Sequence, residues 1–363
     1  MKITIVQKNF QKALAITERI ISKNISLPIL HNILLRTDNN KLIISSTNLE
    51  IGINYLIGAK IEEKGEIAIP ARILSDFISN IQDEKVTLTV KGKALYINSK
   101  NYKTQMIGFD TKEFPIIPKI KEKPIITLPA QILKTSFLSV INSASLLETR
   151  PELSGVFTKF TANNIELAAT DSFRLTERII NQKPNNTGSA IIPRNTVLEI
   201  IRVLSDIDTD INITLSDNQI LFSSVNFTII SRLIDGNYPD YKKVIPENFV
   251  SKVLISKEEL EKGVRLASLF TSNISDIKIK VSENKTEITA KNIDKGELHS
   301  SIESKLKNNP FTISLNYNYL LDGIKAVGSD KVVLQYTGDG SPIVVKKGDE
   351  DKSFTYVIMP LRE

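Results

Sequence analysis

With 363 residues, the chain is too long for one ordinary hydrophobic core, and we expect two or three domains. Its composition, 41% hydrophobic and 24% charged, is typical of a globular protein, and its apolar runs are far too short to span a membrane. Cysteine is absent, which excludes disulfides and thiolate metal sites. The N-terminal MKITIVQKNF has no continuous apolar stretch, so a cytoplasmic location is expected. The net charge of +6 permits an anionic partner without identifying one.

Three segments of the chain open in the same way, with a short β-branched strand, a polar or proline break, and an amphipathic helix. They are KITIVQKNFQKALAI from Lys2, IITLPAQILKTSFLSV from Ile125 and KVLISKEELEKGVRLA from Lys252. A second strand–break–helix set begins at Glu66, Ser189 and Pro310. Within this set, Pro70 and Pro193 are 123 residues apart, and both stand at the predicted helix start, where a missing N–H costs little. The chain therefore contains a repeated unit.

The strands between these helices repeat in register. Thr47-Asn48, Thr170-Asp171 and Lys291-Asn292 occupy equivalent places, and three predicted hairpins turn at Gly92, Asp217-Asn218 and Gly338–Gly340. We predict an α+β fold of three repeated domains, residues 1–123, 124–249 and 250–363. Each domain is expected to consist of two strand–helix–strands halves, with antiparallel sheet on one side and helices on the other.

Residues for catalysis are scarce. The only histidines are His31 and His299, and His31, in the apolar run LPILHNILL, is expected to be a partly buried structural residue. The segment TGDGSP lacks the helix and lysine of a phosphate-binding loop, so it is interpreted as a hairpin turn. No carboxylate set for a two-metal nuclease is recognisable. The sequence therefore favours a binding protein that needs neither metal nor cofactor.

The first predicted helix has one apolar and one basic face. Its expected core stripe consists of Phe10, Ala13, Leu14, Thr17, Ile20 and Ile21. At about 100° per residue, Lys8, Lys12, Arg19 and Lys23 fall within roughly a 60° arc. Such a stripe suits contact with phosphates, although an ordinary solvated face remains the alternative. Further helical cations are Arg72, Arg194 and Arg202, interspersed with the acidic Asp76 and Glu199. No aromatic residues interleave with them, so if the partner is a nucleic acid we expect sequence-independent contact with its backbone and no base stacking.

Several motifs resemble those of the bacterial sliding clamp family, the β subunits of the replicative DNA polymerase III holoenzyme. They include RPELSGV at Arg150–Val156, TDSFRLT at Thr170–Thr176, SRLIDGNYPDY at Ser231–Tyr241 and YVIMPLR at Tyr356–Arg362. LPIL, IPAR, IPR and VSEN add shorter matches in family order from Leu27, Ile69, Ile192 and Val281, so the resemblance spans nearly the whole chain.

The resemblance implies a processivity factor for DNA replication, which is an accessory subunit and no enzyme. The family forms a head-to-tail homodimeric ring around double-stranded DNA and tethers the polymerase. Its partners, which include the polymerase, the clamp-loader ATPase, other polymerases and repair proteins, insert short apolar peptides into a cleft between the second and third domains.

A geometric argument supports the dimer. With helices packed about 10 Å apart, six inner helices give a circumference near 60 Å and a hole near 9 Å. Twelve helices give a hole of roughly 28 Å, which accepts a duplex about 20 Å wide. A closed ring also removes open sheet edges.

The resemblance assigns residues to three sites. The peptide cleft is expected at Arg150, Leu153, Thr170, Arg174, Leu175, Pro239, Lys243, Val244, Asn316, Tyr319, Val357, Met359, Pro360, Leu361 and Arg362. The surface facing DNA is expected to include Lys8, Lys12, Arg19, Lys23, Asn24, Arg72, Arg194 and Arg202. The dimer interface is expected to include Lys103, Met106, Leu269 and Phe270.

Some positions depart from the family pattern. Phe173 stands where a histidine is common, and Asn24 where a DNA-contacting arginine is. Glu152 would repel phosphate, and Gly296 and His299 replace acidic residues of the dimer interface, so weaker dimerisation is a hypothesis. Two other functions remain open from the residues alone: a phosphodiesterase built on the repeats, and a repeat adaptor that binds peptides without DNA.

Overall fold

The computed structural model describes residues 1–21, 27–147, 149–348 and 351–361. Its α-helices within these ranges are α1 (Gln7–Thr17), α2 (Ala71–Asn80), α3 (Ala130–Val140), α4 (Arg194–Val203), α5 (Lys257–Ala267) and α6 (Tyr317–Ala326). Each helix follows directly on a strand, as the repeated strand–break–helix pattern predicts. None of the helices in the described part is long and apolar enough to cross a membrane.

Within the described residues, the strands form three antiparallel sheets. The five-stranded sheet has the order β5 (Lys60–Glu63), β1 (Lys2–Val6), β7 (Lys85–Lys91), β8 (Ala94–Asn98) and β9 (Lys103–Ile107). The eight-stranded sheet has the order β10 (Ile126–Pro129), β15 (Asp210–Leu215), β16 (Gln219–Ser223), β17 (Phe227–Arg232), β4 (Ile51–Gly58), β3 (Lys41–Thr47), β2 (Asn32–Asp38) and β6 (Glu66–Pro70).

The twelve-stranded sheet is the largest. Its order is β14 (Gly188–Pro193), β11 (Gly155–Phe160), β12 (Ile165–Thr170), β13 (Arg174–Ile180), β25 (Phe354–Ile358), β24 (Ile343–Lys346), β23 (Lys331–Tyr336), β18 (Ser251–Ser256), β21 (Gly296–Asn308), β20 (Lys285–Asn292), β19 (Asp276–Ser282) and β22 (Phe311–Asn316). The predicted α+β fold with repeated strand–helix–strands halves and antiparallel sheet is confirmed.

Contacts divide the chain into two compact units. The first unit contains Met1–Ile132 and Leu198–Leu233, and the second contains Leu133–Val197 and Ile234–Glu363. Sheets that continue from one repeat into the next explain this division: β17 pairs with β4 inside the first unit, and β13 pairs with β25 inside the second. The domain boundaries at residues 123 and 249 stay a prediction.

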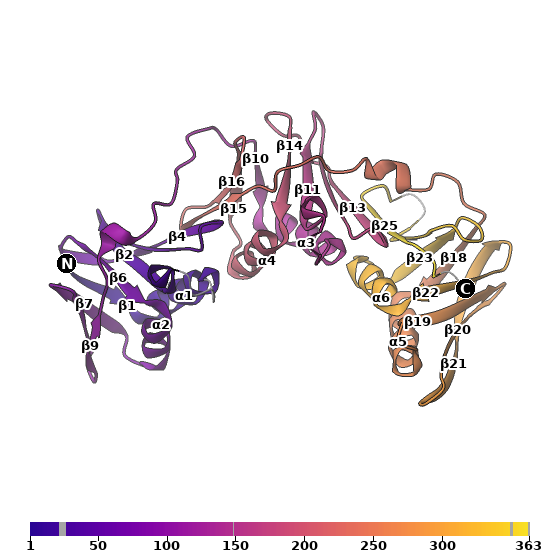
Figure 1. Cartoon of the computed structure of the whole chain (residues 1–363), viewed down its shortest axis with the longest axis horizontal. Helices are drawn as coiled ribbons and strands as arrows, with labels where there is room; N and C mark the ends of the chain where they lie inside the picture. The colour runs from indigo at the N-terminus through magenta and orange to yellow at the C-terminus, as the bar shows by residue number, and fades with distance from the viewer. Residues whose placement is uncertain (22–26, 148, 349–350, 362–363) are drawn as a thin grey trace. The chain divides into compact units, whose positions relative to one another are not determined.

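The helices cover one face of the sheets within each unit. Figure 1 shows α1 beside α2 in the first unit and α5 beside α6 in the second. In α1, the predicted stripe is buried from Phe10 to Ile20, whereas Lys8, Lys12 and Arg19 are exposed. The α-helix ends at Thr17 and a 3-10 turn, Glu18–Ile20, completes the stripe. His31 is half-buried, as predicted.

The same side-chain hydrogen bonds recur in three equivalent turns of the repeats. In the β3–β4 turn, Asn48 Oδ1 accepts from the N–H groups of Glu50 and Ile51 at 3.0 and 2.7 Å. Asp171 Oδ1 accepts from the equivalent N–H groups in the β12–β13 turn, both at 3.0 Å. Asn292 Oδ1 does the same in the β20–β21 turn, at 2.9 and 3.2 Å. These side chains replace backbone partners in a tight turn, which explains why Asn or Asp recurs there.

Candidate functional site

The described residues of the predicted cleft all lie in the second unit. They come from the 3-10 turn Pro151–Leu153 and the residue before it, the facing ends of β12 and β13, the segment from Pro239 through the 3-10 turn Tyr241–Val244, the start of α6, and β25 with the tail that follows it. Arg362 lies outside the described residues. Segments distant in sequence are therefore brought together by the pairing of β13 with β25, which sets Leu175 opposite Val357.

The predicted apolar residues divide into two groups by exposure. Leu153, Leu175 and Val357 are nearly fully buried, with 3%, 3% and 1% of their surface exposed. These three side chains belong to the hydrophobic core under the site and are not available for contact with a partner. Val244 and Met359 are 49% and 37% exposed, so these two side chains are available for contact.

Two main-chain hydrogen bonds hold the C-terminal tail. The Met359 N–H donates to the carbonyl of Phe173, and the Leu361 N–H donates to the carbonyl of Ser314, both at 2.9 Å. The tail is thereby fixed between the β12–β13 turn and the edge strand β22. A methionine on such a tail is an adaptable apolar surface because its thioether side chain is flexible and polarisable.

Arg174 is the most constrained charged residue of the site. Its Nε donates to Asp171 Oδ2 at 2.9 Å, its Nη1 lies 2.5 Å from Asp322 Oδ2, and its side chain is 13% exposed. The guanidinium carbon also lies 4.5 Å from the ring centroid of Tyr319. Arg174 was predicted as a cleft residue, and its two carboxylate partners, Asp171 and Asp322, were not among the predicted residues. In the structure, Arg174 orients Tyr319 as a cation–π partner.

Tyr319 is positioned from three sides. Its ring stacks against Phe173 at a centroid distance of 6.5 Å, and its carbonyl accepts a hydrogen bond from the Tyr356 hydroxyl at 2.8 Å. Tyr356, on β25, packs against α6 at Gly323, where a Cβ would lie 2.7 Å from the tyrosine ring. Glycine at this position therefore lets α6 approach β25 and brings Tyr319 to the cleft.

The segment before the third repeat is anchored by a buried tyrosine. The Tyr241 hydroxyl donates to Glu177 Oε1 at 2.8 Å, and burial together with this carboxylate raises the pKa of Tyr241. Lys242 Nζ lies 2.8 Å from Glu166 Oε1. The rings of Tyr238 and Phe157 stack at 4.9 Å. These contacts fix the chain on either side of Pro239, which is itself exposed.

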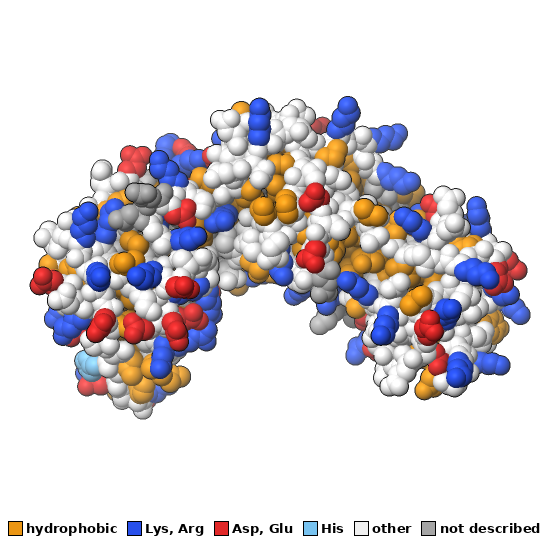
Figure 2. All heavy atoms as spheres, turned by 180° about the vertical axis from the view of Figure 1, so that it is seen from behind, with side chains coloured by type: hydrophobic (Ala, Val, Ile, Leu, Met, Phe, Trp, Pro, Cys, Tyr) orange, Lys and Arg blue, Asp and Glu red, His pale blue; other side chains and the backbone are white. Residues whose placement is uncertain are grey.

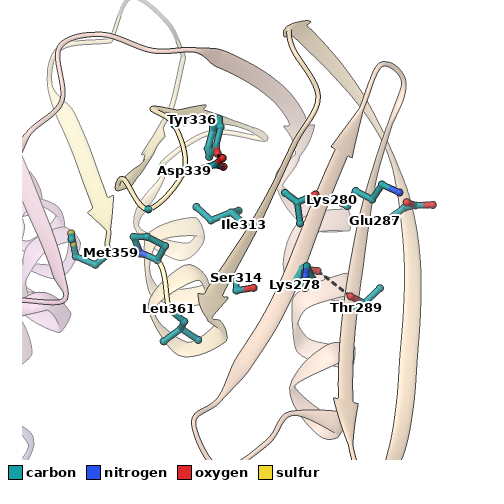
Figure 3. Close-up of a pocket in the computed structure, with 14 residues that line it drawn as sticks. Lys278, Lys280, Glu287, Thr289, Ile313, Ser314, Tyr336, Asp339, Met359 and Leu361 are labelled. Atoms are coloured by element: carbon teal, nitrogen blue, oxygen red, sulfur yellow. Dashed lines mark hydrogen bonds between the residues drawn. The ribbon is translucent and has the colours of Figure 1, made fainter. Parts of the chain in front are cut away.

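A groove of about 980 Å³ lies beside the tail (Figure 3). Lys278, Lys280, Thr289, Ile313 and Tyr336 are among its lining residues. Of the predicted cleft residues that the structure describes, only Met359, Pro360 and Leu361 line it. In Figure 3 the Met359 side chain points away from the strands that carry Lys278 and Thr289. The tail thus borders the groove, and its Met359 side chain is directed away from the opposite wall.

The basic residues predicted to face DNA differ in their surroundings. Lys8, Lys12, Arg19 and Arg72 are exposed. Arg202 is paired with Glu199, whose pKa is raised by burial against the opposing effect of Arg202 and Arg19. Arg194 is only partly exposed. Lys23 and Asn24 lie outside the described residues. On the face shown in Figure 2, basic and acidic side chains are interspersed.

The predicted interface residues lie on a free sheet edge and a short turn. Lys103 and Met106 belong to β9, which ends the five-stranded sheet, and Ile107 on the same strand is 66% exposed. Leu269 is 60% exposed on the 3-10 turn Ser268–Phe270, whereas Phe270 is partly buried against its own core. Ile107, at the end of this strand, was not among the predicted interface residues.

No group of three or more His, Asp or Glu residues in the described part of the chain converges as a metal site. His299 is exposed, with Nε2 3.8 Å from Glu297 Oε1.

Comparison with known proteins gives a consistent result. Residues 1–118, 127–240 and 242–362 match the N-terminal, central and C-terminal domain families of the DNA polymerase III beta subunit. The beta sliding clamp of Staphylococcus epidermidis is 28% identical over 375 residues, covering 100% of this chain and 99% of the relative. That of Staphylococcus aureus is 29% identical with the same coverage.

Solved structures agree with these matches. The DNA polymerase sliding clamp of Bacillus subtilis superposes with a TM-score of 0.95 at 25% identity, over 100% of this chain and 99% of the other. The sliding clamp of Bartonella birtlesii, solved bound to griselimycin, gives a TM-score of 0.94 at 27% identity over 100% of both chains.

Proposed function

Because the chain belongs to the family of bacterial DNA polymerase III beta subunits, we propose that it encircles double-stranded DNA and holds the replicative polymerase on its template. It is a sliding clamp and a non-catalytic accessory subunit. The observation that carries this function is that the repeated strand–helix units follow one another in the order of the three clamp domain families, at residues 1–118, 127–240 and 242–362. We place the repeat boundaries at residues 123 and 249.

The closed form that we propose is a head-to-tail homodimer. Two unpaired edges within the described residues support it. β9 ends the five-stranded sheet, and residues 296–303 of β21 pair with β20 on one side only, because β18 reaches no further than Ser304. Pairing of these edges between two chains would satisfy their free backbone groups. The exposed Ile107 and Leu269 would add apolar contact beside that ladder.

Sequence-independent contact with DNA is assigned to the exposed basic face of α1. Lys8 and Lys12 on α1 and Arg19 on the following 3-10 turn are exposed, and the opposite face of this segment is buried, so their positions are fixed. We assign Arg72 on α2 and Arg194 and Arg202 on α4 to contact with DNA as well, together with Lys23 and Asn24, which lie outside the described residues. Contacts of this kind depend on salt and do not read bases. A protein that works on chromosomal DNA in this way is expected in the cytoplasm.

The cleft around the C-terminal tail is the proposed docking site for partners. Met359 and Val244 offer exposed apolar side chains, and the stacked rings of Phe173 and Tyr319 form a rigid wall beside them. Such a site suits short apolar peptides, because pre-organised aromatic and thioether surfaces bind them at low entropic cost. The proposed partners are the replicative polymerase, the clamp-loader ATPase, other DNA polymerases and repair proteins.

The decisive experiment tests whether the protein is held on DNA by encircling it. The purified chain is loaded onto nicked circular DNA by a clamp-loader ATPase and separated from free protein by gel filtration. The proposal expects co-elution with the circle and loss of the protein when a restriction enzyme linearises the DNA. Retention that survives linearisation, or no retention on circles, would contradict it.

A further inference from the structure

A second, smaller pocket lies in the first unit, outside all the predicted sites. It has a volume of about 110 Å³ and lies where β4 meets β17 under the segment Pro115–Pro118. Two apolar side chains at its rim, Leu49 and Ile116, are 47% and 93% exposed. A volume of this size holds roughly four water molecules, which is far below the several hundred Å³ of a typical small-molecule site. It suits one short aliphatic side chain.

The turn beside this pocket has the same geometry as the turn of the peptide cleft. Thr47 Oγ1 donates to the Ile51 carbonyl at 2.9 Å, as Thr170 Oγ1 does to the Arg174 carbonyl at 2.6 Å. The residue two places on, Leu49 in one turn and Ser172 in the other, has φ of 76° and 77°. A leucine rarely adopts this left-handed backbone, so the turn is imposed by its surroundings.

The neighbouring strand is also equivalent. β17 pairs with β4 so that Ser231 faces Ile51, as Ile358 faces Arg174 in the cleft. The next N–H in each strand then donates to the turn: Arg232 to the Glu50 carbonyl at 2.9 Å, and Met359 to the Phe173 carbonyl at 2.9 Å. Arg232 therefore occupies the place of Met359, and Glu50 the place of Phe173.

The covering segment completes the correspondence. Phe114 and Pro115 match Tyr238 and Pro239 in the cleft, and Phe114 is buried against Leu34 as Tyr238 stacks on Phe157. The main difference is depth. Gly52 stands in place of Leu175, and Ile117 fills the freed space, since a Cβ on Gly52 would lie 2.9 Å from Ile117 Cγ2. The pocket is thus shallower than the cleft, and the charged Arg232 and Glu50 stand at its rim where the cleft has Met359 and Phe173.

We propose that this pocket is a second docking point for an extended segment of a partner protein, which inserts one aliphatic side chain and places an adjacent acidic residue on Arg232. The proposal rests on the proposed function only in taking the cleft as a peptide site. Leu49 and Ile116 provide apolar contact around the inserted side chain, and Arg232 provides the charge partner. A weak second contact of this kind raises the avidity of a partner already held at the cleft.

Photo-crosslinking tests this on the full-length chain. The probe is the peptide acetyl-Gly-Gly-photoleucine-Asp-Gly-amide, and digestion with mass spectrometry locates the labelled residues. The competitors are the same peptide with leucine or with alanine in place of photoleucine. The expected result is labelling within residues 47–52, 115–118 or 230–232 that an excess of the leucine peptide suppresses and an excess of the alanine peptide does not. Labelling at the cleft is measured in the same digest and reports separately on the proposed function. Absence of competed labelling at the pocket overturns the inference, whatever happens at the cleft.

Two surface variants test the charge assignment. Arg232→Gln is expected to lower pocket labelling at least threefold, and Glu50→Gln to raise it, because Glu50 repels the acidic probe. Both side chains are exposed, so neither change threatens folding. Equal labelling in the parent chain and both variants would refute the role of Arg232.

Discussion

Replacing Asp322 by alanine removes one of the two carboxylates that hold Arg174. The Arg174 side chain is 13% exposed and Asp322 is 26% exposed, so the pair is largely shielded from solvent. Breaking a fully buried pair costs about 3–5 kcal/mol. Asp171 remains 2.9 Å from the Arg174 Nε, and Asp322 is partly solvated, so we expect a smaller loss, about 2 kcal/mol, close to that of one charge-assisted hydrogen bond.

Urea denaturation followed by circular dichroism measures this loss. With a slope of about 2 kcal/mol per molar urea, the midpoint of the transition that includes the second unit should fall by about 1 M. Asp240→Ala is the matched control: Asp240 pairs with Lys243 at 3.1 Å, but the two side chains are 61% and 81% exposed, and such pairs contribute little. A midpoint for Asp322→Ala within error of that for Asp240→Ala would refute the assignment of Arg174 as a shielded, structurally paired residue.

Three further predictions concern the tail, the interface and alkaline pH. Deleting Met359–Glu363 should abolish binding of an apolar partner peptide in fluorescence anisotropy while sedimentation still shows a dimer; unchanged peptide affinity would exclude the cleft. Leu269→Asp should weaken the dimer at least tenfold in sedimentation equilibrium, because it puts a charge on an exposed apolar residue of the proposed interface; an unaltered dimer dissociation constant would exclude Leu269 from the interface. Burial and Asp339 raise the pKa of Tyr336 to about 12, whereas the unfolded phenol titrates near 10. Its contribution to stability is therefore present below pH 10 and is lost as the pH rises towards 12, and Tyr336→Phe should flatten this part of the stability profile relative to the parent chain.

The repeat was predictable from the sequence because its signals are local. A strand followed by an amphipathic helix leaves a periodic pattern, and the Asn or Asp of the β3–β4, β12–β13 and β20–β21 turns is required by hydrogen bonds within four residues. The buried stripe of α1 was readable for the same reason.

Other features depend on pairs far apart in sequence. The partner of Arg174 is Asp322, 148 residues away, and no local pattern marks that carboxylate. Likewise, the pairing of β13 with β25 buries Leu175 and Val357, so two residues assigned to the cleft support it from below. The likeness of the pocket near Arg232 to the cleft depends on the registers of β4 with β17 and of β13 with β25, which no local sequence pattern specifies.

The strand ladders that join consecutive repeats limit their autonomy. A chain shortened to its first two repeats would lose β25, and the β13 segment Arg174–Arg178, which pairs with it, would present bare amide and carbonyl groups to solvent. Internal duplication therefore did not yield interchangeable modules here: each repeat completes the sheet of its neighbour, and excised pieces are expected to aggregate rather than fold alone.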